Sequence, residues 1–146
     1  MKIKIIMIDK NSSLKELNNA FLNPNNISIE DGFTKAINRL ADKLTRANLW
    51  IYILKMLIEK ENGIYGYEIK KNIEEKFGFE PATVSGYVIL YKMKRDNLVQ
   101  IEWKNSEEGK PNRKYYKITE RGMEAMRQAK MYLIKLLDEV FDKIEL

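Results

Sequence analysis

The chain has 146 residues, a formal net charge of +5 at pH 7, and neither histidine nor cysteine. These absences exclude Ser-His-Asp triads, Cys-His pairs, histidine- or thiolate-based zinc sites and disulfides. The length and the 45% hydrophobic content predict one folded domain with an extension. No apolar run approaches the roughly 20 residues of a membrane span, and the N-terminus lacks a signal-peptide pattern. We therefore expect a cytoplasmic protein with no membrane partner, no metal and no cofactor.

Residues 1–45 are predicted to form an N-terminal extension to the domain. Residues 2–9 combine lysine with isoleucine and could form a strand, or an arm that reaches a partner. A short helix capped by Ser12 or Ser13 is expected next, since a glutamate stands at the capping-box spacing from Ser13. A second helix should begin near Ser28 and present an apolar face that enlarges a dimer core. That face consists of Phe33, Ile37, Leu40, Ala41 and Leu44.

Three further helices are predicted after the extension. Residues 49–61 are apolar on nearly every side, which indicates a buried central helix. The extension's second helix either continues into it or breaks just before it. Another helix over 68–77 ends at Gly78, which can adopt the left-handed conformation that follows many helices. The last begins at Pro81 and stops at Asn97, because asparagine also tolerates that conformation.

The helix that begins at Pro81 carries small hydroxyl and aromatic residues in its first turns, namely Thr83, Ser85 and Tyr87. In helix-turn-helix proteins, this part of the second helix enters the major groove of DNA. Lys92 lies farther along, near the edge of the helix's apolar stripe. Tyr87 itself falls on that stripe, so it could instead be a core residue.

A β-hairpin is predicted to follow. Residues 98–103 alternate apolar and polar side chains, residues 113–119 are rich in Tyr, Ile and Thr, and the loop between them holds turn-forming residues. One of the adjacent Tyr115 and Tyr116 should be a core residue. The hairpin's basic residues could follow a phosphate backbone, or could be ordinary solvated surface. The bases are Lys104, Lys110, Arg113, Lys114 and Lys117, and the acids are Glu107 and Glu108.

Helices followed by a hairpin in this order predict a mainly α fold with a small β-hairpin. More narrowly, residues 46–119 are expected to form a winged helix-turn-helix. Residues 120–146 are expected to form a long helix capped by Thr119. Its apolar residues recur at nearly seven-residue spacing, which favours a dimerisation seam with a second copy of the chain over packing on its own domain alone. The seam residues are Met126, Ala129, Leu133, Leu136 and Val140.

Residues 46–140 resemble the PadR family of winged-helix transcriptional regulators. The resemblance lies in residues 49–69, which contain a Gly-Tyr-Glu-Ile motif, and in residues 87–99 and 113–122. The family's Gly-Arg-Pro wing appears here as Gly-Lys-Pro with an inserted Asn112. The resemblance implies a homodimer, built through the first and last helices, that binds a palindromic operator. It also implies a regulator that is usually a repressor and is often relieved by a small ligand.

The resemblance further implies which residues would face double-stranded DNA. From the helices these are Tyr67, Thr83, Ser85, Tyr87 and Lys92, and from the wing they are Lys110, Asn112, Arg113 and Lys114. Lysines and arginines would neutralise phosphates, whereas Thr83 and Ser85 could reach base edges. Trp50, Tyr52 and Tyr132 could line an effector cavity at the dimer interface, although packing is the commoner role of aromatic residues at helical spacing.

Three other functions fit parts of the sequence. An enzyme would need paired carboxylates such as Glu74 and Glu75, but neighbouring residues on a helix point apart. The chain also has no Gly-rich phosphate loop, so we expect no enzyme. A winged helix that binds a protein partner would use the acidic Glu107 and Glu108. A DNA-binding protein without sequence preference would be distinguished by its ratio of specific to non-specific affinity.

Overall fold

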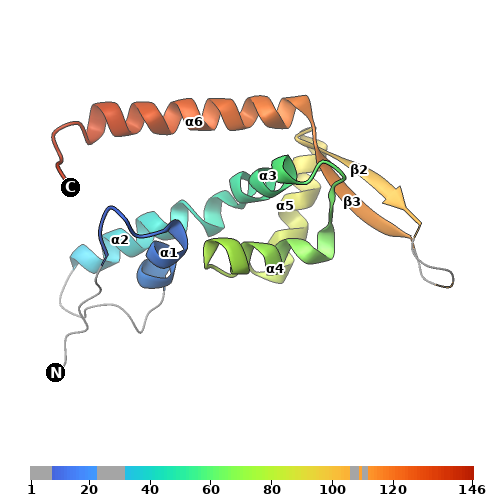
Figure 1. Cartoon of the computed structure of the whole chain (residues 1–146), viewed down its shortest axis with the longest axis horizontal. Coiled ribbons are helices and arrows are strands. Elements are labelled where there is room, and N and C mark those ends of the chain that lie inside the picture. The colour runs from blue at the N-terminus through green and yellow to red at the C-terminus, as the bar shows by residue number, and fades with distance from the viewer. Residues whose placement is uncertain (1–7, 23–31, 106–108, 110–111) are drawn as a thin grey trace, which may run out of the picture.

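The computed structural model describes residues 8–22, 32–105, 109 and 112–146. These residues form mostly helices, with one small antiparallel sheet (Figure 1). The expected fold, mainly α with a β-hairpin wing, is therefore confirmed. None of the helices in this part of the chain is long and apolar enough to cross a membrane. In chain order the elements are α1 (Leu14–Leu22), α2 (Gly32–Lys43), the short 3-10 helix η2 (Arg46–Asn48), α3 (Leu49–Glu59), β1 (Ile64–Tyr65), α4 (Gly66–Phe77), α5 (Thr83–Arg95), β2 (Val99–Lys104), β3 (Arg113–Ile118) and α6 (Glu120–Val140).

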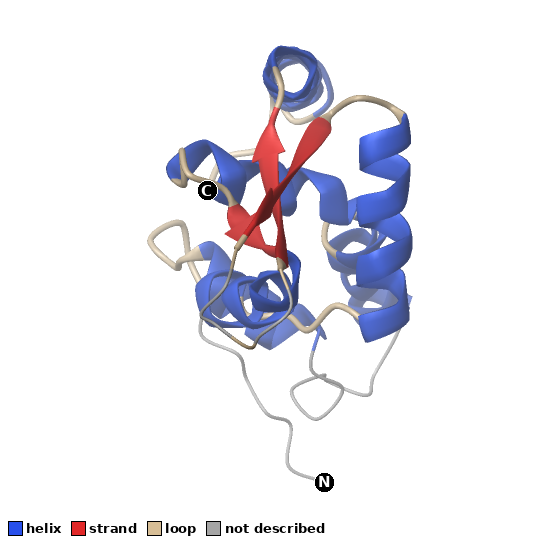
Figure 2. Ribbon diagram, turned by 90° about the vertical axis from the view of Figure 1, so that its right-hand side faces the viewer, coloured by secondary structure: helices blue, strands red, loops and turns tan. Residues whose placement is uncertain are grey.

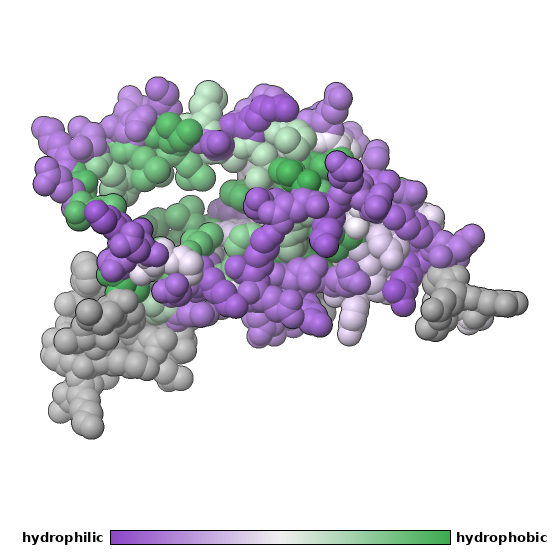
Figure 3. All heavy atoms as spheres, in the orientation of Figure 1, coloured by the Kyte–Doolittle hydropathy of each residue, from purple (hydrophilic) through white to green (hydrophobic). Residues whose placement is uncertain are grey.

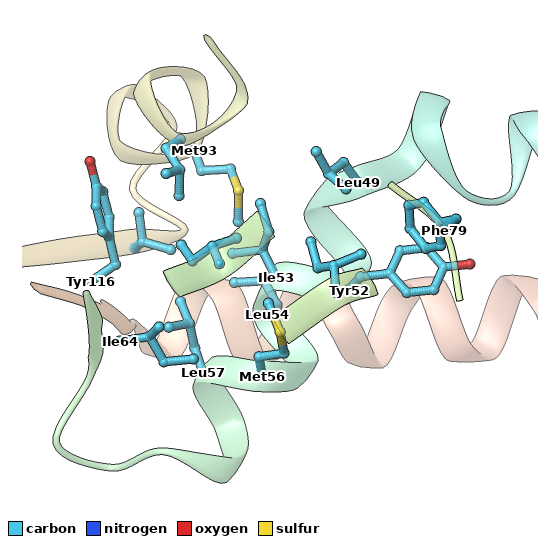
Figure 4. Packing of buried hydrophobic residues seen from close by; sticks show 14 residues of the cluster. Leu49, Tyr52, Ile53, Leu54, Met56, Leu57, Ile64, Phe79, Met93 and Tyr116 are labelled. Carbon is cyan, nitrogen blue, oxygen red and sulfur yellow. The ribbon is translucent and has the colours of Figure 1, made fainter. Parts of the chain in front are cut away.

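The central helix α3 supplies the middle of the core. Ile53, Leu54 and Leu57 are almost fully buried, and α4, α5, β3 and α6 all contact this helix. Figure 4 shows these side chains packed against Ile64 and Tyr116 of the sheet and Met93 of α5. A helix that is apolar on nearly every side must be covered on most of its surface, and of the residues of α3 only Lys55, Ile58 and Glu59 are exposed.

Tyr52 connects this core to the turn between α4 and α5. Its ring packs edge-on against Phe77 and Phe79, with centroids 5.0 and 4.9 Å apart. Its hydroxyl donates to the carbonyl of Leu44, and burial raises the pKa of the hydroxyl above its ordinary value. Tyr52 is therefore a core residue that fixes the approach to α5.

The sheet has the strand order β1-β3-β2. The sequence predicts a hairpin of two strands and no strand at residues 64–65, and the structure corrects this by adding β1 to the hairpin. Strand β1 pairs Ile64 with Tyr116 and Tyr65 with Tyr115. Two residues are too few to show an alternating pattern, so this strand depends on its partner β3 and not on local propensity. Figure 2 shows the three strands in red, in front of the helices.

The start of α5 also differs from the prediction. The helix begins at Thr83 and not at Pro81, because Ala82 has an extended backbone with φ −63° and ψ 139°. The two predicted helix ends are confirmed. Gly78 after α4 and Asn97 after α5 have φ values of 73° and 60°, in the left-handed region.

The start of α6 forms a tight junction with the end of α5. As predicted, Thr119 caps α6, and its Oγ1 accepts from the Gly122 N–H at 3.0 Å. The same hydroxyl donates to the carbonyl of Asn97 at 2.6 Å, and the Thr119 N–H donates to the carbonyl of Leu98 at 3.1 Å. Gly122 is buried here. The long helix is thereby tied to the turn that ends α5.

The N-terminal extension packs against α4 through α1. The Glu16 N–H donates to Ser13 Oγ at 3.0 Å, so the predicted cap of α1 is confirmed and is Ser13. The chain breaks between α2 and α3, where the buried Thr45 hydroxyl donates to the carbonyl of Ala41 at 2.7 Å. This answers the question that the sequence left open.

Part of the predicted extension lies outside the described residues. This holds for most of the possible strand over 2–9, for the helix start near Ser28 and for the side chain of Phe33. Leu40 and Leu44, which belong to the predicted apolar face, are 50% and 44% exposed. That face is only partly covered by its own chain.

Asn18 fastens α1 to the end of α4. Its side chain is buried, and Nδ2 donates to the carbonyl of Phe77 at 2.8 Å. Asn18→Ala should lower the free energy of unfolding by about 1–3 kcal/mol, because this hydrogen bond is lost inside the protein. Urea denaturation at fixed protein concentration measures the change. Asn11→Ala, at an exposed position, should change stability by less than about 0.5 kcal/mol. Equal losses in both variants would contradict the role of the contact.

Candidate nucleic-acid interface

A groove of about 700 Å³ lies between the start of α4, the start of α5 and the foot of β3. Five helices and strands, α3, β1, α4, α5 and β3, contribute residues to it, so only the folded chain brings them together. Among the lining residues are Tyr65 of β1, Tyr67 and Lys71 of α4, Tyr87 of α5 and Arg113 of β3. Aromatic rings and cations around one concave surface suit a ligand with both sugars or bases and phosphates.

The exposed side of α5 turns toward this groove. Tyr87 is 60% exposed, whereas Leu90 and Met93 are 3% and 1% exposed. The alternative that Tyr87 is a core residue is therefore wrong. The buried stripe of the helix passes through Leu90 and Met93. Each three-residue step falls roughly 60° short of a full turn, so Tyr87 lies roughly 120° around the helix from Met93 and outside the stripe.

Tyr67 stands in the first turn of α4, at the edge of the groove. It is 76% exposed, and its ring centroid lies 6.0 Å from that of Tyr65. A large aromatic side chain with a free hydroxyl at this position can contact a sugar or a phosphate.

The wing strands divide their side chains between two faces, as alternation along a strand requires. On the inner face, Tyr116 is buried, which confirms that one of the two adjacent tyrosines is a core residue. Trp103 on the same face, near the hairpin end, is exposed. On the outer face, Arg113 lies opposite Lys104, and Tyr115 is the next residue on that side.

The cations of the wing lie against aromatic rings. Lys104 Nζ is 4.4 Å from the ring centroid of Tyr115, and Arg113 Cζ is 5.0 Å from that of Tyr65. Lys114 Nζ is 5.9 Å from the ring of Trp103. Such contacts orient a cation without cancelling its charge, so the charge remains available to a phosphate.

Other cations of this region are already paired. Lys117 contacts Glu102 at 2.6 Å, and this hydrogen bond lowers the pKa of the Glu102 carboxyl below its ordinary value. Lys70 contacts Glu80 at 3.1 Å. Over the described ranges, the ring-bound cations of the wing form no such ion pair. Among the described residues, the cations that a phosphate would find without a carboxylate partner are Lys104, Arg113 and Lys114, at the hairpin end of β2 and β3.

The remaining predicted DNA contacts are placed only in part. Lys92 and Asn112 are exposed. The side chains of Thr83 and Ser85 lie outside the described residues, and only their backbone is placed, in the first turn of α5. Lys110 lies outside the described residues altogether.

Sequence reasoning missed Tyr65 as part of this surface. Its place depends on the pairing of β1 with β3, which sets Tyr65 opposite Tyr115. The only signal in the sequence is a pair of tyrosines two positions apart, Tyr65 and Tyr67, close to the start of a predicted helix. That signal does not reveal the partner strand.

A family model described as the transcriptional regulator PadR-like family matches residues 53–128, just over half of the chain. The chain belongs to the PadR-like family. The matched range runs from α3 through the winged helix into α6, so it contains the groove and the wing. This confirms the resemblance seen in the sequence, and the family is one of transcriptional regulators, not of enzymes. No curated protein matches the chain.

Solved structures of similar fold include two PadR proteins. A PadR-like transcriptional regulator from Bacillus cereus strain ATCC 14579 is 27% identical with a TM-score of 0.57, over 71% of this chain and 98% of that one. A PadR family transcriptional regulator from Eggerthella lenta DSM 2243 is 24% identical with a TM-score of 0.62, over 77% and 96%. A winged-helix DNA-binding protein from STIV is 17% identical with a TM-score of 0.52, over 65% and 96%. At their lower identities, the last two show the fold alone.

In this PadR-like protein, α6 forms a second surface, on the side of the molecule away from α4 (Figure 1). Met126 and Ala129 of the predicted seam are half-buried on their own domain. Leu133, Leu136 and Val140 are exposed, and so is every other residue of the second half of the helix. Figure 3 shows apolar side chains on both sides of the hollow between this half of α6 and the helices below it.

The three residues of the predicted effector cavity lie in different surroundings. Tyr52 is a core residue, as described above. Trp50 is half-buried, and its Nε1 donates to Asn48 Oδ1 at 3.3 Å. Tyr132 is 70% exposed on α6. None of the three lines the 700 Å³ groove.

Proposed function

We propose that this PadR-like protein is a sequence-specific repressor that binds a palindromic operator as a homodimer. The observation that carries the proposal is the groove that gathers Tyr67, Tyr87 and Arg113 from three elements, beside the ring-bound cations of the wing. A protein that binds chromosomal DNA in this way acts in the cytoplasm of its cell.

Contacts divide by chemistry. The first turns of α5 enter the major groove, where Thr83, Ser85 and Tyr87 meet base edges. Tyr67 and Lys92 contact sugar and phosphate on either side. The wing follows the backbone next to the site and neutralises phosphates. Its contacts are made by Lys110, Asn112, Arg113 and Lys114.

The homodimer in this proposal forms through α6. A two-fold seam of Leu133, Leu136 and Val140 would cover apolar side chains that the single chain leaves exposed. Leu40 and Leu44 of the extension are also exposed in the single chain, and in this proposal they join the same apolar surface. Residues 1–45, 46–119 and 120–146 then serve as extension, DNA-binding domain and dimerisation helix. Two-fold symmetry predicts operator half-sites centred about 10 base pairs, or a multiple of a helical turn, apart.

A small-molecule effector is the finer part of the proposal. A site between the subunits would use Trp50, which is half-buried, and Tyr132, which is exposed. Tyr52 would support this site without contacting the ligand, because its ring already packs against Phe77 and Phe79. A ligand bound there would change the relative orientation of the two subunits from a site that does not contact DNA.

The test is binding to a labelled duplex from the gene's own upstream region and to a scrambled duplex, across salt concentration. We expect a preference of about a thousandfold or more for the upstream duplex. Arg113→Ala and Lys114→Ala should each reduce the slope of log K against log salt by about 1, because each removes one phosphate contact. Lys135→Ala, on the exposed half of α6, is the matched control and should leave the slope unchanged.

Two results would replace the proposal. Equal affinity for both duplexes, falling steeply with salt concentration, would indicate a DNA-coating protein without sequence preference. No binding even at low salt would indicate a winged helix that recognises a protein partner.

A further inference from the structure

The outer face of the sheet carries an unbroken row of rings and cations. Lys104 Nζ lies 4.4 Å from the Tyr115 ring, and the Tyr115 and Tyr65 ring centroids are 6.0 Å apart. Arg113 Cζ lies 5.0 Å from the Tyr65 ring on the groove side. Tyr67 continues the row, with its ring 6.0 Å from that of Tyr65. Tyr65 thus contacts three of the other four members and stands at the centre of the row.

The pairing of β1 with β3 explains this position. Ile64 and Tyr116 face each other across the two strands and are both buried, 3% and 6% exposed. Alternation then puts Tyr65 and Tyr115 on the opposite, outer face. Tyr65 is only half-buried there, so the core does not require an aromatic residue at this position.

Arg113 needs such a support. An arginine side chain at an exposed strand end has many rotamers, and each must be given up when it binds a phosphate. A ring beneath the guanidinium reduces that cost before DNA arrives, and it leaves the fork of N–H donors free. Arg113 also lines the groove between α4 and α5.

We propose that Tyr65 is a positioning residue, which holds Arg113 over the groove in the geometry that contacts a DNA phosphate. The inference rests on the proposed DNA binding, and it assigns Tyr65 a role that is exerted through Arg113. The ring alone is needed, and the hydroxyl is not.

A double-mutant cycle on DNA binding tests this proposal. Affinity for the upstream duplex is measured across salt for the wild type, Tyr65→Leu, Arg113→Ala and the double variant, with melting temperatures recorded for each. Tyr65→Leu should weaken binding by about two- to fivefold, the size of an exposed cation–π contact. It should also flatten the salt slope in the direction of Arg113→Ala. The double variant should bind no more weakly than Arg113→Ala alone. Tyr65→Phe keeps the ring and should bind like the wild type.

Each other outcome overturns the inference. Losses that multiply in the double variant mean that Tyr65 acts independently of Arg113. A loss in Tyr65→Phe equal to that in Tyr65→Leu means that the hydroxyl contacts DNA directly. If the wild type binds DNA and Arg113→Ala weakens it while Tyr65→Leu does not, the inference fails and the proposed function stands. If the wild type binds no DNA, the proposed function itself fails.

Discussion

Replacing Leu133 and Leu136 with aspartate is expected to convert the protein to a monomer and to weaken operator binding by about a hundredfold or more. Both residues lie on the second half of α6, where they remain 37% and 36% exposed in the single chain. A buried aspartate in a helix seam would lose its hydration without gaining a partner, so the seam would open. A monomer then binds one half-site and loses the gain in affinity that linked binding provides.

Light scattering coupled to gel filtration measures the first effect, and duplex binding measures the second. Lys135→Asp is the matched control, because it introduces the same side chain on the same helix, roughly 200° around from Leu133. The control should remain a dimer with nearly unchanged affinity. A dimeric Leu133→Asp/Leu136→Asp variant would move the subunit interface away from α6.

Gly122→Ala is expected to destabilise the protein by about 3 kcal/mol, at the upper end of overpacking effects. An added Cβ would stand 2.3 Å from the carbonyl oxygen of Leu98 and 2.8 Å from Cγ1 of Ile118. The first of these is backbone and cannot rotate away. Either α6 or the strand entry must shift, and the junction that Thr119 builds would loosen. Thermal denaturation at one protein concentration should show a melting temperature lower by about 6–12 °C.

Gly86→Ala is the matched control, because the same substitution should raise the stability of the protein there instead of lowering it. Gly86 lies inside α5, and an added Cβ would meet nothing within 4 Å. Alanine is favoured over glycine in a helix by about 1 kcal/mol, so this variant should melt higher than the wild type. Similar losses in both variants would show that glycine flexibility, not space, matters at these positions.

The helices of the domain could be predicted from the sequence because each has one strong local signal. The all-round apolar character of α3, the left-handed stops at Gly78 and Asn97, and the cap at Thr119 all act within a few residues. The family motifs follow the same elements, so they led to the right fold and family.

The missing parts depend on tertiary contacts. Strand β1 forms only because β3 lies beside it. The contact between Tyr65 and Arg113 depends on this pairing, so it could not be predicted from the sequence. The apolar pattern of α5 did not decide which side of the helix is buried, because Tyr87, three residues before the buried Leu90, is 60% exposed. Tyr87 was therefore ambiguous in the sequence and is plain in the structure.

The junction at Thr119 also sets the direction in which α6 leaves the domain. The Thr119 hydroxyl joins the carbonyl of Asn97, at the end of α5, to the first turn of α6. The exposed second half of α6, residues 131–140, makes an arm about 15 Å long beyond the part that packs on its own domain. A tilt of roughly 10° over such an arm moves its end by about 3 Å, or about one base-pair step. In a dimer joined through α6, the angle at which the two helices cross would therefore set the distance between the two DNA-binding domains.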